Sequence, residues 1–137
     1  MEALGWIYIK QGDYEGALAQ FDQIPEHAGH KFAGAALRGY VFGKMGRLDD
    51  WKRMHDLLEE RRTEHPEVSL EVDFALLHLA LRDFDRVFEY LDQAYEARLG
   101  QMVFIRANAR WAELREDPRF EELVERISSG QIVEGVA

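Results

Sequence analysis

Histidine is the side chain best suited to bind a metal or transfer a proton near neutral pH, and the chain carries five. His27 and His30 stand close together with Glu26 beside them. Two imidazoles and a carboxylate could bind a metal ion weakly, but a solvated loop is the commoner reason for such a stretch, and we predict no metal site. His78 stands alone on an apolar helical face, where a packed core histidine is the expectation.

The sequence lacks other catalytic constellations. There is no cysteine, hence no thiolate ligand or nucleophile, and the only serines are Ser69, Ser128 and Ser129. No Gly-rich phosphate loop and no Gly-x-Ser-x-Gly elbow occurs. Carboxylate pairs such as Glu59 and Glu60 resemble solvated helix faces. We therefore expect a protein that is not an enzyme and uses no cofactor.

Composition narrows the class of partner. The chain has 137 residues, 47% of them hydrophobic, which predicts one folded domain, and a formal net charge of -9. That charge argues against sequence-independent nucleic-acid binding and against anionic membranes, both of which need cations. No apolar run approaches the ~18 residues of a membrane span. We expect a cytoplasmic protein whose partner is a protein or peptide of neutral to basic character.

A repeat organises the elements that would position any site. Gly12 and Gly46 are 46 − 12 = 34 residues apart, and YIKQGDY (residues 8–14) matches FGKMGRL (residues 42–48). A weaker third copy, LRDFD (residues 81–85), follows at a step of 84 − 48 = 36. Internal periods of this size are typical of helical-repeat arrays.

Each copy predicts two helices joined by a short turn, because its apolar residues recur at helical spacing. Pro25 ends the first copy, and Pro66 suits the first position of a helix. A single hairpin cannot bury its apolar face alone, so the copies must stack. We predict one all-α domain over residues 1–127, with repeats at about 1–25, 30–63 and 66–98, a C-terminal cap at 101–127 and a flexible tail at 128–137.

The period and the helix–turn–helix unit resemble the tetratricopeptide repeat over about residues 1–98. The family's small residue in the first helix corresponds to Gly5, Gly39 and Ala75. Its aromatic residue three positions later corresponds to Tyr8, Phe42 and, in the third copy, His78. The resemblance implies an α-solenoid of about three such hairpins that binds proteins without catalysis.

The sequence departs from the family in the second helix of each copy. The family's small residue there matches Ala17, but Trp51 and Val87 occupy the equivalent positions. We expect a bulky residue at this contact to splay the two helices. In addition, Met1 stands where the family's first helix is already under way, so the first repeat lacks part of its opening turn.

The C-terminal region resembles the ending of many bacterial multi-repeat proteins, through AYE (residues 94–96) and WAELREDPRF (residues 111–120). That resemblance implies the regulatory or interaction end of a larger bacterial protein. Asp117 is a good N-cap and Pro118 a good first helical residue. The helix that follows can cover the open end of the stack.

In this family the first helices of successive repeats line a concave groove, and the resemblance implies a partner site there. The groove positions correspond to Trp6, Ile9, Lys10, Ala36, Tyr40, Gly43, Lys44, Val72, Leu76 and Leu79. An apolar helix or extended segment would suit this surface, with Lys10 and Lys44 reaching a carboxylate.

Ordinary structural roles compete with this interpretation. Trp6 and Tyr40 are as readily core residues, Leu76 and Leu79 could be covered by the terminal helices, and surface lysines are commonly just solvated. Glu2 and Trp6 also stand where one subclass of the family needs Lys and Asn to clamp a C-terminal carboxylate, so we do not predict chaperone-tail binding.

Two other functions stay open. The first is homo-oligomerisation through the apolar groove or the open N-terminal repeat. The second, less favoured, is RNA binding by a related helical-hairpin repeat, which needs a basic groove.

Overall fold

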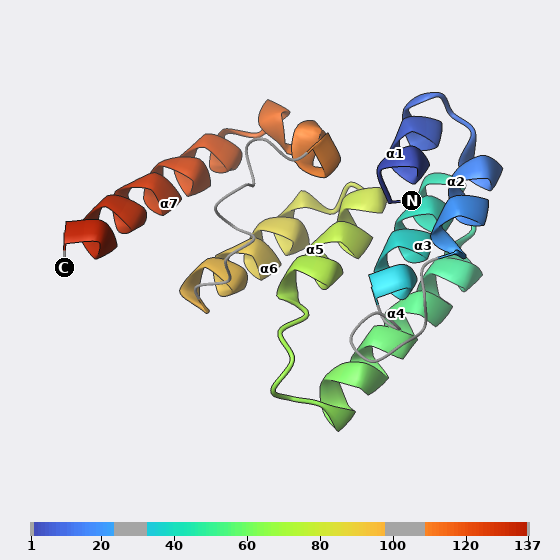
Figure 1. The fold of residues 1–137 in the computed structure, drawn as a ribbon, viewed down its shortest axis with the longest axis horizontal. Helices are drawn as coiled ribbons and strands as arrows, with labels where there is room; N and C mark the ends of the chain where they lie inside the picture. The colour runs from blue at the N-terminus through green and yellow to red at the C-terminus, as the bar shows by residue number, and fades with distance from the viewer. Residues whose placement is uncertain (1, 24–32, 98–108, 137) are drawn as a thin grey trace.

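The computed structural model describes residues 2–23, 33–97 and 109–136, and all regular structure within these ranges is helical (Figure 1). The all-α prediction is confirmed for these ranges. The elements are α1 (Glu2–Lys10), α2 (Tyr14–Phe21), α3 (Ala33–Lys44), α4 (Leu48–Glu64), α5 (Glu71–Ala80), α6 (Phe84–Glu96), the 3₁₀ helix η2 (Ala109–Glu116) and α7 (Pro118–Val136). Within these ranges, no helix is both long and apolar enough to cross a membrane.

The helices pack as consecutive pairs. α1 packs on α2, α3 on α4, and α5 on α6, while α3 also contacts both α2 and α5. The pairs lie side by side along the molecule, and α7 extends at the end opposite α1 (Figure 1). Each pair therefore buries its apolar residues against the next one, and a single buried cluster runs from Ala17 in α2 to Ile127 in α7.

The turns inside the pairs share one backbone geometry. Gly12 and Gly46 have φ of 79° and 77°, and Arg82 has φ of 55°. The next amide in each case donates to a carbonyl five residues back, at 2.9 Å for Asp13 to Tyr8 and for Arg47 to Phe42, and at 3.1 Å for Asp83 to His78. This bond satisfies a carbonyl that the helix end would leave unpaired, and it requires the left-handed conformation at the preceding residue.

The second helices start at a regular interval that continues to the C-terminus. α2, α4, α6 and α7 begin at residues 14, 48, 84 and 118, in steps of 34, 36 and 34. Asp13, Asp83 and Asp117 precede three of these helices, and their carboxylates accept backbone amides of the first turn at 2.9, 3.4 and 2.9 Å. Such N-caps fix where a helix begins.

α7 accordingly lies beside α6 in the same direction. Arg119 binds Asp85 at 2.8 Å, and Arg126 binds Asp92; both pairs are 34 residues apart in sequence. The segment predicted as a cap therefore takes the place of a further helix pair, with η2 as its short first helix. α7 continues through Val136, across most of the segment from residue 128 for which the sequence predicts a flexible tail.

The small residues of the first helices lie where helices approach closely. A Cβ at Gly5 would overlap the ring of Phe21, and one at Gly39 would overlap Leu77 and lie 3.1 Å from the Cβ of Met54. Ala75, the third member of the set, is fully buried. Their small size is therefore a packing requirement within and between the pairs.

Trp51, the bulky residue in α4, is accommodated by a small residue on the facing helix. A Cβ at Gly43 would lie 3.1 Å from Trp51 Cδ1 and 2.7 Å from the Cβ of Ala80. The indole N–H of Trp51 then reaches α5 and donates to the Leu77 carbonyl at 2.9 Å. That carbonyl belongs to the last turn of α5, where acceptors lack helical partners. Trp51 thus joins two helix pairs.

Gly39→Ala should destabilise the fold by about 1–3 kcal/mol, because the added methyl overpacks a contact with Leu77 and Met54. The matched control is Gly34→Ala in the same helix, where the added Cβ meets only the end of the Arg38 side chain at 3.1 Å. The control should be neutral or stabilising by up to ~1 kcal/mol through helix propensity. Urea unfolding followed by circular dichroism measures both, and equal effects would contradict the packing role of Gly39.

Candidate functional site

Most of the apolar residues of the predicted groove are buried. The buried set consists of Ala36, Val72, Leu76 and Leu79, which are 1%, 6%, 1% and 0% exposed. A partner could touch these four only after the elements covering them had moved. Lys10 is exposed and Ile9 is half-buried. The predicted groove is therefore not an open apolar surface along its length.

Two of the other predicted residues, Lys44 and Tyr40, which is itself 3% exposed, meet at one carboxylate. Glu113 Oε1 accepts from the Tyr40 hydroxyl at 2.9 Å and from Lys44 Nζ at 2.6 Å. Arg82 Nη1 donates to Glu113 Oε2 at 3.1 Å. We call Tyr40, Lys44 and Arg82 the carboxylate cluster, and Glu113 its occupant. Both oxygens of the occupant are bound, by donors from two different helix pairs.

Helical geometry places the donors. Tyr40 and Lys44 are four residues apart on α3, so their side chains share one face, and Lys44 Nζ lies 5.5 Å from the centre of the Tyr40 ring. The ring of Trp6 packs on Tyr40 from α1, with the centroids 5.1 Å apart. Arg82 comes from the turn between α5 and α6. The three donors therefore converge only because α3 and α5 pack side by side.

Arg82 adopts a backbone conformation that its residue type disfavours. Gly12 and Gly46 hold the matching position in the two earlier turns, and Arg82 is the only non-glycine residue with positive φ in the described ranges. A left-handed conformation costs a residue with a Cβ about 1 kcal/mol relative to glycine. The guanidinium presented there binds Glu113 and also lies 3.6 Å from Glu116.

The cluster is partly shielded from water. The side chains of Lys44 and Glu113 are 19% and 27% exposed, and that of Arg82 is 54% exposed. Burial, together with the charge and hydrogen bond of Glu113, raises the pKa of Tyr40 well above its usual value, so its hydroxyl stays a donor. Charge-assisted hydrogen bonds in such a setting contribute about 1–3 kcal/mol each at most, and exposed ion pairs less.

Sequence reasoning identified Tyr40 and Lys44 but missed Arg82 and Glu113. The signal for Arg82 was present, since an arginine stands where the other two turns carry glycine. For Glu113 there was no local signal, because its partners lie 73, 69 and 31 residues away in sequence.

The isolated histidine of α5 lies in an aromatic cluster. His78 is 6% exposed, and neither of its ring nitrogens has a hydrogen-bond partner. The rings of Trp51, His55 and Tyr90 surround it at 5.4, 5.8 and 5.7 Å between centroids. Burial, then the nearby His55, lowers its pKa to about 4, and the charge of Arg86 acts in the same direction against that of Asp83. The predicted core role of His78 matches this environment.

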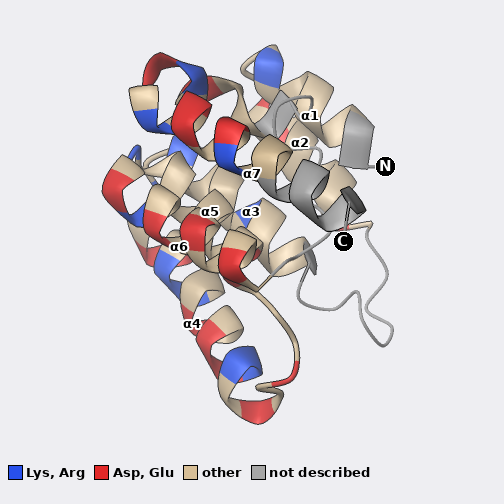
Figure 2. Cartoon of the chain, turned by 90° about the vertical axis from the view of Figure 1, so that its left-hand side faces the viewer, with Lys and Arg blue, Asp and Glu red and all other residues tan. Residues whose placement is uncertain are grey.

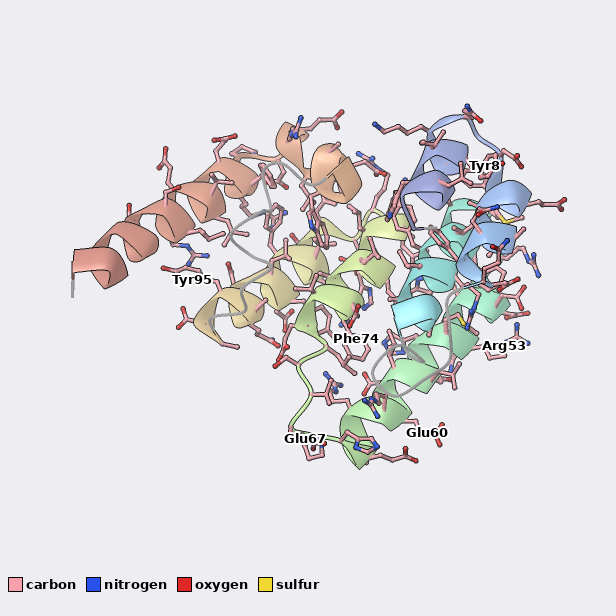
Figure 3. All side chains as sticks on the ribbon, viewed as in Figure 1. Tyr8, Arg53, Glu60, Glu67, Phe74 and Tyr95 are labelled. Carbon is pink, nitrogen blue, oxygen red and sulfur yellow. The ribbon has the colours of Figure 1, made fainter. Side chains whose placement is uncertain are left out.

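Phe74 completes this aromatic cluster between α5 and α4 (Figure 3). Its ring lies 5.5 Å from that of His55 and 5.4 Å from that of Tyr90, and the guanidinium of Arg62 lies over it at 4.7 Å. At the other end of the molecule, Tyr95 of α6 donates its hydroxyl to the Arg126 carbonyl of α7 at 3.1 Å. These aromatic residues thus join neighbouring helices.

The first turn of α5 carries a pair of carboxyl groups. Burial, then the nearby charge of Glu71, raises the pKa of Asp73 to about 7. One carboxylate oxygen of Glu71 is buried without a hydrogen-bond partner. No group of three metal-ligating side chains exists in the ranges that the structure covers. The pair His27 and His30, with Glu26, lies outside the described residues.

Acidic and basic residues are interspersed along the outer helices. Figure 2 shows red and blue segments alternating on α4, α6 and α7, with no continuous basic stripe on the face that it displays. A groove for nucleic-acid phosphates would need such a stripe.

None of the protein-family models, curated proteins or solved structures compared with this chain matches it.

His78 and Asp73, the two groups of α5 with shifted pKa values, should make the stability of the fold depend on pH in opposite directions. His78 is protonated below pH ~6.5 in the unfolded chain but only below about 4 when folded, so its contribution falls as pH drops between these values. Asp73 ionises from pH ~4 in the unfolded chain but only near 7 when folded, so its contribution falls as pH rises across that window.

The free energy of unfolding of His78→Phe should therefore rise relative to that of the parent by roughly 1–3 kcal/mol as pH falls from 6.5 to 4. The free energy of unfolding of Asp73→Asn should rise relative to that of the parent as pH rises from 4 to 7. Urea midpoints across this range measure both differences, and each variant serves as the control for the other. Two difference curves with the same slope would contradict the assigned environments.

Glu113→Gln should destabilise the protein by about 1–2 kcal/mol, because Lys44 and Tyr40 lose a charged acceptor in a partly buried site. Hydrogen exchange of residues 111–129 should accelerate. The matched control is Glu116→Gln, whose side chain is 77% exposed and makes one contact at 3.6 Å. That change should stay within ~0.5 kcal/mol, and an equal loss in both variants would contradict a specific role for Glu113.

Proposed function

We propose that this chain is a tetratricopeptide-like helical-repeat module, an α-solenoid of hairpins, that binds a protein or peptide. The regular starts of the second helices support the repeat architecture. So do the shared turn geometry and the close helix contacts at Gly5 and Gly39. Helical repeats of this kind use the surface along their first helices for recognition.

The carboxylate cluster carries the proposal. It lies on the surface that the family resemblance assigns to partners, and it already binds a glutamate from a separate segment of the chain. The donors come from α3 and from the α5–α6 turn, so a ligand bound there is held by two repeats at once. Aromatic and cationic groups that converge in this way are typical of binding hot spots.

The biological setting is part of the same proposal. A cytoplasmic module at the regulatory or interaction end of a larger bacterial protein fits the resemblance of the C-terminal region. Such a module recruits a partner and carries out no chemistry, in keeping with the residue types of the cluster.

Self-association through α1 is a second candidate, favoured by one observation. Leu4 and Ile7 of α1 are 41% and 51% exposed, whereas Val41 and Leu77, which follow Ile7 at steps of 34 and 36, are 0% exposed. The matching face of the later pairs is thus covered, while that of α1 is open. If this face pairs with another copy, light scattering should show a concentration-dependent dimer that Ile7→Lys abolishes.

Affinity capture with matched baits tests the main proposal. The groove bait carries Lys44→Glu and Arg82→Glu, and the control bait carries Lys52→Glu and Arg53→Glu. The control residues lie on α4, with side chains that are 71% and 65% exposed. Each bait replaces one lysine and one arginine by glutamate, so the change in net charge is the same in both. Circular dichroism first establishes that all baits are folded.

A partner captured by the parent and the control, but at least tenfold less by the groove bait, is the expected result. Binding of purified partner by calorimetry then gives the ratio directly. Equal capture by all three baits would move the binding surface away from the carboxylate cluster and contradict the proposal.

A further inference from the structure

The helix η2 occupies the carboxylate cluster in the manner of a bound peptide. It presents three residues to the rest of the chain: Trp111 and Leu114, which are 3% and 0% exposed, and Glu113, which meets the three donors. Ala112 and Arg115, between and after them, are exposed. Two apolar anchors and one acid in four residues form a compact recognition pattern.

We propose that the carboxylate cluster is a receptor for an acidic peptide segment of a partner protein, and that η2 is an internal stand-in that the partner displaces. This inference rests on the proposed function and names the chemistry of the partner. The segment carries a glutamate or aspartate next to an aromatic and an aliphatic residue, as in the WAEL sequence of residues 111–114.

Charge complementarity favours this occupant. The cluster offers an ammonium, a guanidinium and a neutral hydroxyl, and once Glu113 has left it offers no carboxylate to a cationic ligand. The expectation of a neutral to basic partner came from the net charge of -9, which acts at long range. Once Glu113 has left, the cluster itself presents the two positive charges of Lys44 and Arg82.

The backbone of Arg82 supports a binding role over a purely structural one. Two of the three equivalent turns use glycine, and glycine in the third would allow the same turn without strain. An unfavourable conformation that persists where a side chain meets a ligand is typical of functional sites. The partial exposure of Lys44, Arg82 and Glu113 leaves the contact open to competition from solvent and from other carboxylates.

The probe is a fluorescent peptide with the sequence of residues 109–117, ARWAELRED. The receptor is the full chain, as the parent and as Glu113→Gln, in which the internal helix has lost its carboxylate. Fluorescence anisotropy should show binding at least about tenfold tighter to Glu113→Gln, because the internal competitor is weakened. A peptide with glutamine in place of its first glutamate, the match of Glu113, should bind at least tenfold more weakly.

A receptor with Glu113→Gln and Lys44→Met should lose the peptide, while one with Glu113→Gln and Lys52→Met should retain it. Circular dichroism and hydrogen exchange establish that each receptor is folded. Equal binding of the peptide to the parent and to Glu113→Gln, or none to either at millimolar concentration, would overturn the displacement proposal.

Two further outcomes are distinct. If Glu113→Gln dimerises and the peptide dissolves the dimer, the occupant is the η2 segment of a second copy, and the partner-peptide proposal is overturned. If a captured partner depends on Lys44 and Arg82 but does not compete with the peptide, the proposed function stands and the displacement inference fails.

Discussion

The open apolar face of each helix pair is the constraint on which the rest of the structure depends. A pair of helices in this chain cannot cover its own buried residues, so every pair needs a neighbour. α3 meets this need on both sides, through α2 and α5. The close contacts at Gly39 and Gly43 and the bridge from Trp51 to α5 follow from it. The last pair is closed by α7, which is fixed to α6 by Arg119 and Arg126 at a spacing of 34 residues.

The same closure brings a charged group to the predicted binding surface. The short helix before α7 stands in the place of a first helix, and from there Glu113 reaches Tyr40, Lys44 and Arg82. A segment that completes the core therefore also fills the cluster that the family resemblance assigns to a partner. The segment that contains η2 therefore both covers the end of the core and fills the carboxylate cluster.

The sequence predicted most of the helices because their signals are local. Glycine at the turns, aspartate at the caps and apolar residues at helical spacing each act within a few residues. Tyr40 and Lys44 were found through their place in the repeat. The burial of Leu76 and Leu79 was left as an alternative, since periodicity shows which residues share a face but not what covers it. Glu113 was missed because its partners are distant in the chain. No local signal in the sequence indicated that α7 continues as far as Val136.

Cross-linking across the contact between Lys44 and Glu113 tests most directly whether η2 docks on the carboxylate cluster. A carbodiimide joins a carboxylate to an amine in contact with it, and the chain has only four lysines, Lys10, Lys31, Lys44 and Lys52. Mass spectrometry of the cross-linked monomer should find Lys44 joined to Glu113, whose atoms are 2.6 Å apart, as well as the exposed pair Lys52 and Asp56 at 2.9 Å as an internal control. Both links should form within one chain. Formation of the control link without the Lys44–Glu113 link would contradict the docking of η2 on the carboxylate cluster.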